Sequence, residues 1–152
     1  PLPTMVQLEG EAILRLLDMR RMIESGIVRR AATNATLAQR TEISRLCDSL
    51  LKVVAAGQSY RAADLAFHAV ICDATGNPMI GQLIQRMDEA FERSAETPFS
   101  VPGFGLASFP PHRDLSDAIV AGDADAAEAA INTFIDRVET EIRQIITSAA
   151  TR

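Results

Sequence analysis

The sequence predicts an all-α protein, a single-domain antiparallel bundle of about six helices. Two observations lead to this fold class. Ala, Leu, Arg and Glu dominate the chain, and apolar residues recur at the spacing of amphipathic helices, without the alternation typical of strands. The chain has 152 residues, enough for one domain with its own core. In such bundles a binding site is usually built between facing helices.

The first half of the chain predicts three helices, over residues 8–33, 36–56 and 60–75. The stripe of the first helix runs from Ile13 to Ala31 and includes a charged residue, Arg20. Ser59 is a candidate N-cap for the third helix, because its hydroxyl can accept a hydrogen bond from a backbone N–H of the first turn. Gly76 can supply the left-handed residue that ends this helix.

The second half predicts three more helices, a fourth from residue 78, a fifth over 111–121 and a sixth over 124–148. Asn77 can cap the fourth helix, with Pro78 at its first position, where a missing N–H costs nothing. Gly122 is expected to end the fifth helix, and Asp123 to cap the sixth.

Residues 97–111 break the helical pattern, because they contain four prolines and two glycines. The segment also carries three aromatic residues, Phe99, Phe104 and Phe109. It is interpreted either as a loop folded over an apolar opening or as a partly disordered connector.

Composition and charge limit the possible functions. The net charge of −5 and the scattered arginines provide no basic surface for duplex DNA. No apolar run is long enough to span a bilayer, and no signal peptide is visible at the N-terminus, so a cytoplasmic protein without membrane contact is expected. Cys47 and Cys72 are interpreted as buried thiols of a reducing compartment.

Three polar residues lie on or beside apolar stripes. Asp64 and His68 are one turn apart on the predicted third helix, and His112 faces the core side of the fifth. An Asp with two His is a ligand set suited to Zn, Ni, Mn or Fe. The alternative is an Asp–His hydrogen bond beside an unrelated core histidine.

Arg20 is the fourth polar residue on an apolar stripe, and a buried guanidinium needs an anion. Glu24, one turn further on, is the structural candidate, and the carboxylate of a bound ligand is the functional one. The nucleophile motifs GxSxG and HExxH are absent from the sequence, as are Cys–His spacings and phosphate-binding glycine loops. We therefore assign no catalytic residue and expect a protein that is not an enzyme.

Three stretches in order resemble the signature of the FCD domain, the C-terminal effector-binding domain of FadR-type GntR transcription regulators. They are "DMRRMIESGIVRRAA", "YRAADLAFHAVICDATGNPMI" and "HRDLSDAIVAGDADAAEAAI". The resemblance implies that residues 1–152 form one effector-binding and dimerisation domain, a helical bundle around a ligand cavity. It also implies an N-terminal winged helix-turn-helix domain, which this chain lacks and through which alone the protein would contact DNA.

The resemblance also implies a metal site and a small-molecule effector such as an organic acid. Carried over by position, the metal ligands are Asp64, His68 and His112, which with Arg20 and Phe134 would line the effector site. The departure is Phe134, which stands where the family has its last His. This leaves two alternatives, a divalent metal with three protein ligands or a metal-free pocket.

The function expected from these observations is that of a ligand-sensing regulatory domain, acting as a homodimer. Two rival functions remain. One is a small metal-dependent hydrolase that uses the Asp and the two His, although no further residue is placed as a general base. The other is a structural dimerisation module with a filled core.

Overall fold

The computed structural model describes residues 3–95 and 109–151, and the side chains within them except at positions 91–95. These residues form six α-helices and no strand, which confirms the all-α prediction. The helices are α1 (Pro3–Asn34), α2 (Leu37–Ala55), α3 (Arg61–Asp73), α4 (Pro78–Ala95), α5 (Pro110–Ala121) and α6 (Ala124–Ala150).

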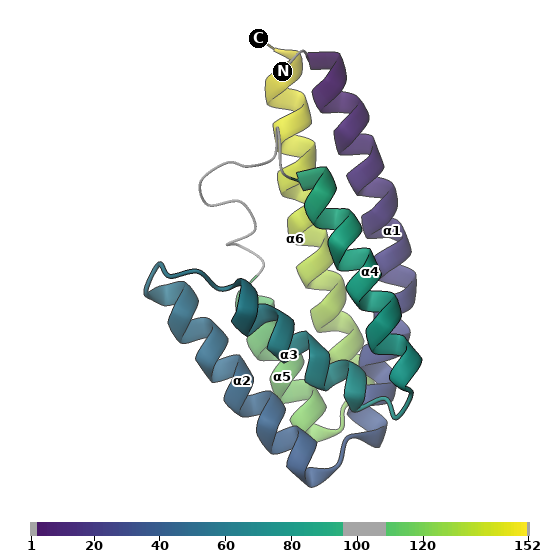
Figure 1. The fold of residues 1–152 in the computed structure, drawn as a ribbon, viewed down its shortest axis with the longest axis vertical. Helices are drawn as coiled ribbons and strands as arrows, with labels where there is room; N and C mark the ends of the chain where they lie inside the picture. The colour runs from purple at the N-terminus through teal and green to yellow at the C-terminus, as the bar shows by residue number, and fades with distance from the viewer. Residues whose placement is uncertain (1–2, 96–108, 152) are drawn as a thin grey trace.

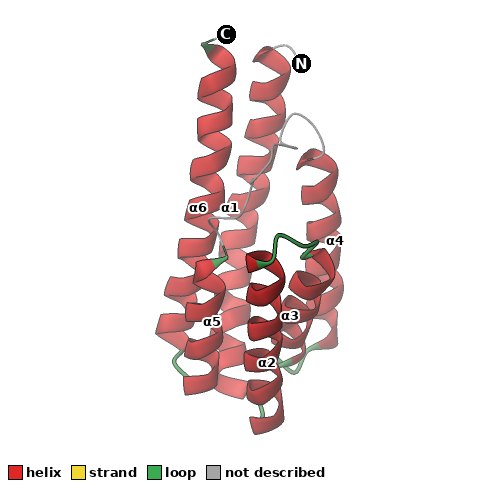
Figure 2. Cartoon of the chain, turned by 90° about the vertical axis from the view of Figure 1, so that its left-hand side faces the viewer, coloured by secondary structure: helices red, strands yellow, loops and turns green. Residues whose placement is uncertain are grey.

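The two longest helices, α1 and α6, lie side by side along the length of the molecule (Figure 1). They run in opposite directions, so both chain termini lie at the same end. The shorter helices pack around the other end, where α3 contacts α1, α2 and α4, and α5 contacts α1, α2 and α6 (Figure 2). The bundle is therefore thick only in this half, where four or more helices surround a common interior.

The core follows the stripes expected from the sequence. Ile13 and Leu17 of α1 and Ile131 and Ile142 of α6 are almost completely buried. Phe67 of α3 is also fully buried and lies among these helices. Both cysteines are buried free thiols, as predicted, and burial raises the pKa of Cys72 to about 12.

Several predicted caps are confirmed, although α1 begins at Pro3, five residues before the predicted start, and α3 ends at Asp73, two residues before its predicted end. The Asp123 carboxylate accepts a hydrogen bond from the N–H of Ala126, and Gly122 has the left-handed φ of 73°. Asn77 accepts from the N–H of Met79 and thus caps α4. The prediction for Ser59 was wrong, because α3 begins one residue later. Its N-cap is Tyr60, without a side-chain capping bond, and the Tyr60 ring packs edge-on against Phe109 at 4.6 Å.

Arg40 connects three helices at the lower end of the bundle. Its guanidinium group donates to the carbonyl oxygens of Ala32 at 2.9 Å and Ala35 at 3.0 Å, and also to that of Ile119. These carbonyls lie at or just beyond the C-terminal ends of α1 and α5, where few backbone donors remain, although that of Ile119 also accepts from the N–H of Gly122. One side chain of α2 therefore holds the ends of α1 and α5 together.

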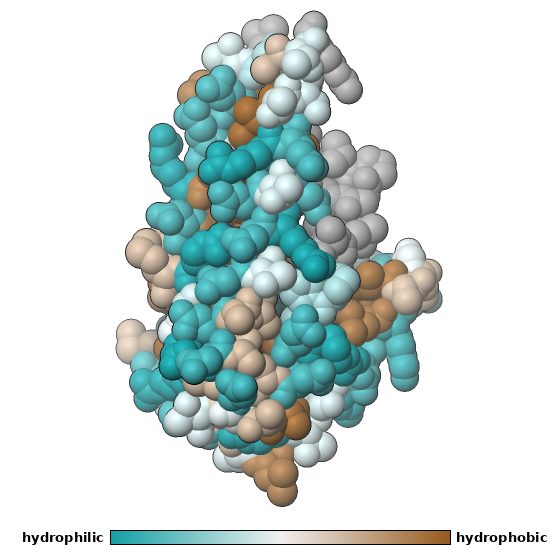
Figure 3. Space-filling model, turned by 180° about the vertical axis from the view of Figure 1, so that it is seen from behind, coloured by the Kyte–Doolittle hydropathy of each residue, from teal (hydrophilic) through white to brown (hydrophobic). Residues whose placement is uncertain are grey.

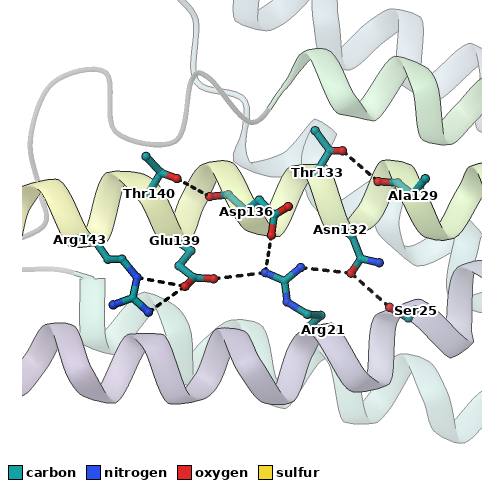
Figure 4. A network of polar contacts seen from close by, with 9 residues as sticks. All are labelled: Arg21, Ser25, Ala129, Asn132, Thr133, Asp136, Glu139, Thr140 and Arg143. Carbon is teal, nitrogen blue, oxygen red and sulfur yellow. Dashed lines mark hydrogen bonds and ion pairs between the residues drawn. The ribbon is translucent and has the colours of Figure 1, made fainter.

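The face drawn in Figure 3 is mostly hydrophilic, with apolar side chains scattered over it from the top to the lower tip and on both sides. A polar network joins α1 to α6 near this surface (Figure 4). Its centre is Arg21, which lies 2.7 Å from Asp136 and 3.3 Å from both Asn132 and Glu139. Among the described residues, none of the helices combines the length and apolar character that a membrane span requires.

The interpretation of residues 97–111 as a loop over an apolar opening falls mostly outside the described residues. Phe99 and Phe104 belong to the part that is not described. Phe109 is described and buried, and its surroundings belong to the candidate site.

Candidate metal centre

The three predicted ligands come together at the contact between α3 and α5. Asp64 and His68 project from successive turns of α3. His112 lies in the first turn of α5, which starts with two prolines, Pro110 and Pro111. Proline is favoured there because its fixed φ suits a helix start. The His112 side chain is almost completely buried and faces Asp64 and His68 of α3, although it is more than 40 residues away in the sequence.

One carboxylate oxygen of Asp64 lies between the two imidazoles. Its Oδ1 is 3.2 Å from Nε2 of His68 and 3.2 Å from Nε2 of His112. The ligand atoms of the three side chains all lie within 4.8 Å of one another. Tetrahedral Zn²⁺ keeps neighbouring ligand atoms roughly 3.3 Å apart. Both Asp–His separations therefore suit a shared ion, and without an ion each Nε2–H can donate to the carboxylate.

Aromatic rings hold the two imidazoles in place. Phe109 stacks on His112 with a centroid separation of 5.1 Å, and Phe67 lies 5.5 and 5.6 Å from His68 and His112. Phe134 of α6 is 5.2 Å from His112 and 6.4 Å from His68. Position 134 therefore contacts both histidines, and its phenyl ring contributes no metal-ligating atom.

A buried ion-pair cluster also adjoins Phe134. The guanidinium carbon of Arg20 is 5.9 Å from the centroid of the Phe134 ring. Arg20 is only 7% exposed, and its Nε donates to Glu24 at 3.0 Å. A second carboxylate, that of Asp88 on α4, lies 3.6 Å from the Arg20 guanidinium. Arg20 therefore pairs with Glu24, the partner expected from the sequence, and also with Asp88, which the sequence did not indicate.

The charges of these groups act on one another across the site. Burial would raise the pKa of Asp64, but His68 and His112 lower it far below its usual range. Burial would lower the pKa of His68, but Asp64 and, more weakly, Glu24 raise it. Burial likewise opposes the charge of Arg20, and the neighbouring carboxylates, Glu24 foremost, raise its pKa. The Asp64 carboxylate and the Arg20 guanidinium are therefore charged inside the bundle.

A small cavity of about 10 Å³ adjoins His68. Glu24, Cys72 and apolar residues of α1, α3, α4, α5 and α6 complete its wall. This volume holds roughly one water molecule. A metabolite would fit there only after side chains or helices move apart.

The sequence indicated part of this site and missed the rest. Asp64, His68, His112 and Arg20 were named from their positions on or beside helical stripes, and Phe134 was named from the resemblance to the FCD domain. Asp88 was missed because it stands on a stretch of α4 whose orientation toward α1 no local pattern reveals. Phe109 was named only as one of three loop aromatics, and its stacking on the nearby His112 was not foreseen.

Comparison with known proteins places the chain in a family. Residues 15–137 match the FCD domain. The HTH-type transcriptional regulator LutR of Bacillus subtilis is 27% identical over 144 residues, which cover 91% of this chain and 66% of that protein. The galactonate operon transcriptional repressor of Escherichia coli is 27% identical over 142 residues, covering 88% of this chain and 58% of the repressor.

A third relative, the putative transcriptional regulatory protein NedR of Micromonospora viridifaciens, is 28% identical over 109 residues, covering 72% of this chain and 79% of that protein. This chain thus spans less than two thirds of LutR and of the galactonate repressor. The relatives are transcription regulators, which points to a regulatory domain and away from an enzyme, as predicted. The chain belongs to the FCD domain family.

Proposed function

We propose that this domain senses a small organic acid in the interior between α1, α3, α5 and α6, with a divalent metal ion as part of the binding site. The observation that carries the proposal is the convergence of Asp64, His68 and His112 within 4.8 Å in a member of a family of regulators. Two imidazole nitrogens and a carboxylate oxygen suit Zn²⁺, Ni²⁺, Mn²⁺ or Fe²⁺. With three protein ligands, coordination positions remain for water or an effector oxygen.

The charge balance of the interior supports a divalent ion. Asp64, Glu24 and Asp88 are three carboxylates, and among the described side chains the guanidinium group of Arg20 lies with them. With neutral imidazoles and ionised carboxylates, the cluster carries two net negative charges, which one divalent cation would neutralise. Burial raises the pKa of Asp88, an effect that Arg20 partly offsets, so a cation nearby would favour its ionised form.

Arg20 and Phe134 suggest how the effector would be recognised. The Arg20 guanidinium can bind a carboxylate in a bidentate manner, in exchange for one of its present acidic partners. Phe134 brings an apolar ring close to both this guanidinium and the histidines. We therefore propose an organic acid with an apolar portion, less polar than a dicarboxylate.

In the complete regulator this domain would act on a DNA-binding domain. The proposal rests on the family and on the partial coverage of LutR and the galactonate repressor. The net charge of −5 gives this chain no DNA-binding surface of its own, so DNA contact would come through a winged helix-turn-helix domain. Two copies would form a homodimer, because paired half-sites are read by two-fold symmetric proteins. The effector would regulate by binding more tightly to one arrangement of the domains.

Native mass spectrometry of protein purified without chelator tests this proposal. We expect a mass increment equal to one divalent metal per chain, which disappears after treatment with a chelator and returns with added Zn²⁺. The Asp64→Asn variant preserves the size of the side chain and removes its charge, so it should lose the increment. Wild-type protein that acquires no metal even when Zn²⁺ is added would contradict the metal site.

A further inference from the structure

The outer face of α1 carries an apolar stripe that no other part of the described chain covers. Met5, Leu8, Met19 and Met22 are 50%, 62%, 38% and 69% exposed. Ala12 and Arg15, which continue the series, are exposed as well. We call these six residues the outer α1 stripe. The inner face of the same helix packs against α6, α4, α3 and α5, so the stripe lies outside the core.

The spacing of the outer α1 stripe is that of a coiled-coil seam. Its members follow one another by three, four, three, four and three residues, from Met5 to Met22. This heptad spacing keeps side chains on one face toward a second, nearly parallel or antiparallel helix. The stripe is roughly 25 Å long at 1.5 Å per residue. The partner is therefore expected to be another helix of comparable length.

The stripe is also complementary to itself when reversed. In an antiparallel pair centred between residues 13 and 14, Met5 faces Met22 of the partner subunit, and Leu8 faces Met19 of the partner subunit. At the centre Ala12 faces Arg15 of the partner subunit, so the smallest member meets the longest one. The series reads the same from either end, and a two-fold axis requires such self-complementarity. A parallel pair would instead stack Arg15 on Arg15 of the partner subunit.

The charged residues near the midpoint of the stripe also suit an antiparallel pair. Arg15 already lies 4.0 Å from Glu11 on its own helix. Glu11 adjoins Ala12, so the facing Arg15 of the partner subunit also meets an acidic neighbour. We infer that two copies of this chain associate through the outer α1 stripes, packed antiparallel. The inference rests on the homodimer of the proposed function and adds the face and the direction of packing.

Cross-linking tests the direction. In the antiparallel pair, Met5→Cys and Met22→Cys in one chain would face each other across the interface, whereas each site lies roughly 25 Å from its own copy. A short bis-maleimide should therefore link the double variant into a covalent dimer and leave both single variants unlinked. Cys47 and Cys72 are buried and do not compete. Linkage of the single variants instead would overturn the antiparallel arrangement.

Sedimentation velocity at micromolar concentration tests the face. Leu8→Glu together with Met22→Glu should weaken a wild-type dimer at least about 100-fold, because like charges are placed in the seam. Leu37→Glu on α2 is the matched control, since Leu37 is 82% exposed and outside the stripe. It should leave the dimer intact, and circular dichroism should show all variants equally helical.

Two outcomes of the sedimentation experiment would overturn the inference. A wild-type dimer that the stripe variant leaves intact would refute this face, while the homodimer and the metal site stand. A wild-type monomer would refute both the face and the dimer. The metal measurement is independent of either result, so failure of the sensing proposal would be seen separately.

Discussion

Arg20 and Arg21 are neighbours in the sequence, yet α1 places them in opposite surroundings. Arg20 faces the interior, where it is 7% exposed and pairs with Glu24 and Asp88. Arg21 faces α6 near the surface, where its side chain is 30% exposed and binds Asp136 and Glu139 (Figure 4). Two arginines therefore form ion-pair networks in different surroundings: that of Arg21 is reached by water, and that of Arg20 is almost fully buried.

The contrast suggests different roles for the two networks: the Arg21 network joins α1 to α6, whereas the Arg20 cluster belongs to a candidate binding site. Ion pairs that water still reaches contribute little to stability, typically less than about 1 kcal/mol each. Buried ion pairs are costly to assemble, and apolar residues of equal volume often serve stability as well or better. The Arg20–Glu24–Asp88 cluster is thus poorly explained by stability alone, and its position beside Phe134 and the histidines suits a role in ligand binding.

The largest effect is expected when the buried network loses one partner. Glu24→Ala should reduce the free energy of unfolding by about 3 kcal/mol, because it leaves the buried Arg20 with the more distant Asp88. Replacing Arg20 and Glu24 together, with Arg20→Leu and Glu24→Leu, should recover part of this loss, because Asp88, which then lacks its guanidinium partner, can become protonated. Urea denaturation monitored by circular dichroism measures all three proteins. A double variant as unstable as Glu24→Ala would show that the pair itself stabilises the fold.

Arg40 should give an intermediate effect, because it is partly buried and bonds only to carbonyl groups. Arg40→Ala leaves helix-end carbonyls without a charged donor and should cost about 2 kcal/mol of unfolding free energy. Arg45→Ala on the same helix is the control, since Arg45 is exposed and pairs with Glu42. Thermal unfolding should separate the two variants clearly, and equal melting temperatures would contradict this assignment for Arg40.

Phe134→His should strengthen metal binding by about tenfold, or ~1.4 kcal/mol. The new imidazole would lie against His68 and His112 and could replace a water ligand. Phe134→Leu removes the ring without adding a ligand, so it controls for the loss of core volume and should not strengthen binding. Competition with a chromogenic Zn²⁺ chelator measures the affinities. No gain in the histidine variant would mean that the side chain at position 134 cannot reach the ion.

The smallest effect is expected in the surface network. Arg21→Ala should lower the unfolding free energy by less than about 1 kcal/mol, and the difference should shrink further at high salt. Denaturation at low and high ionic strength tests this expectation. A loss as large as that of Glu24→Ala, insensitive to salt, would remove the distinction between the two networks.

The sequence predicted what depends on local pattern and missed what depends on how helices meet. The fifth-helix pattern placed His112 toward the core, and the Asp123 cap followed from its position before the sixth helix. The Arg21 network was not predicted, because its partners are more than 100 residues away on the outward side of α6. Pairing between polar faces depends on the rotation of two helices about their axes, which periodicity alone leaves open.

The error at Ser59 has a similar origin. Ser59 has the right chemistry for a cap, but Tyr60 packs against Phe109, a residue from a segment remote in the sequence. This contact accompanies a helix that starts at Arg61 without a side-chain cap. The local preference for a serine cap is weaker than the packing of the Tyr60 ring on the buried Phe109. Asp88 was missed because its importance comes only from its distance to Arg20.

The most direct test of the account is a calorimetric titration of the wild type with Zn²⁺ and Ni²⁺, compared with His68→Ala and with Glu42→Gln as a control for an exposed carboxylate on α2. We expect the wild type and Glu42→Gln to bind a single ion per chain with saturation, and His68→Ala to bind none. Absence of binding to the wild type, or unchanged binding to His68→Ala, would contradict a metal centre formed by Asp64, His68 and His112.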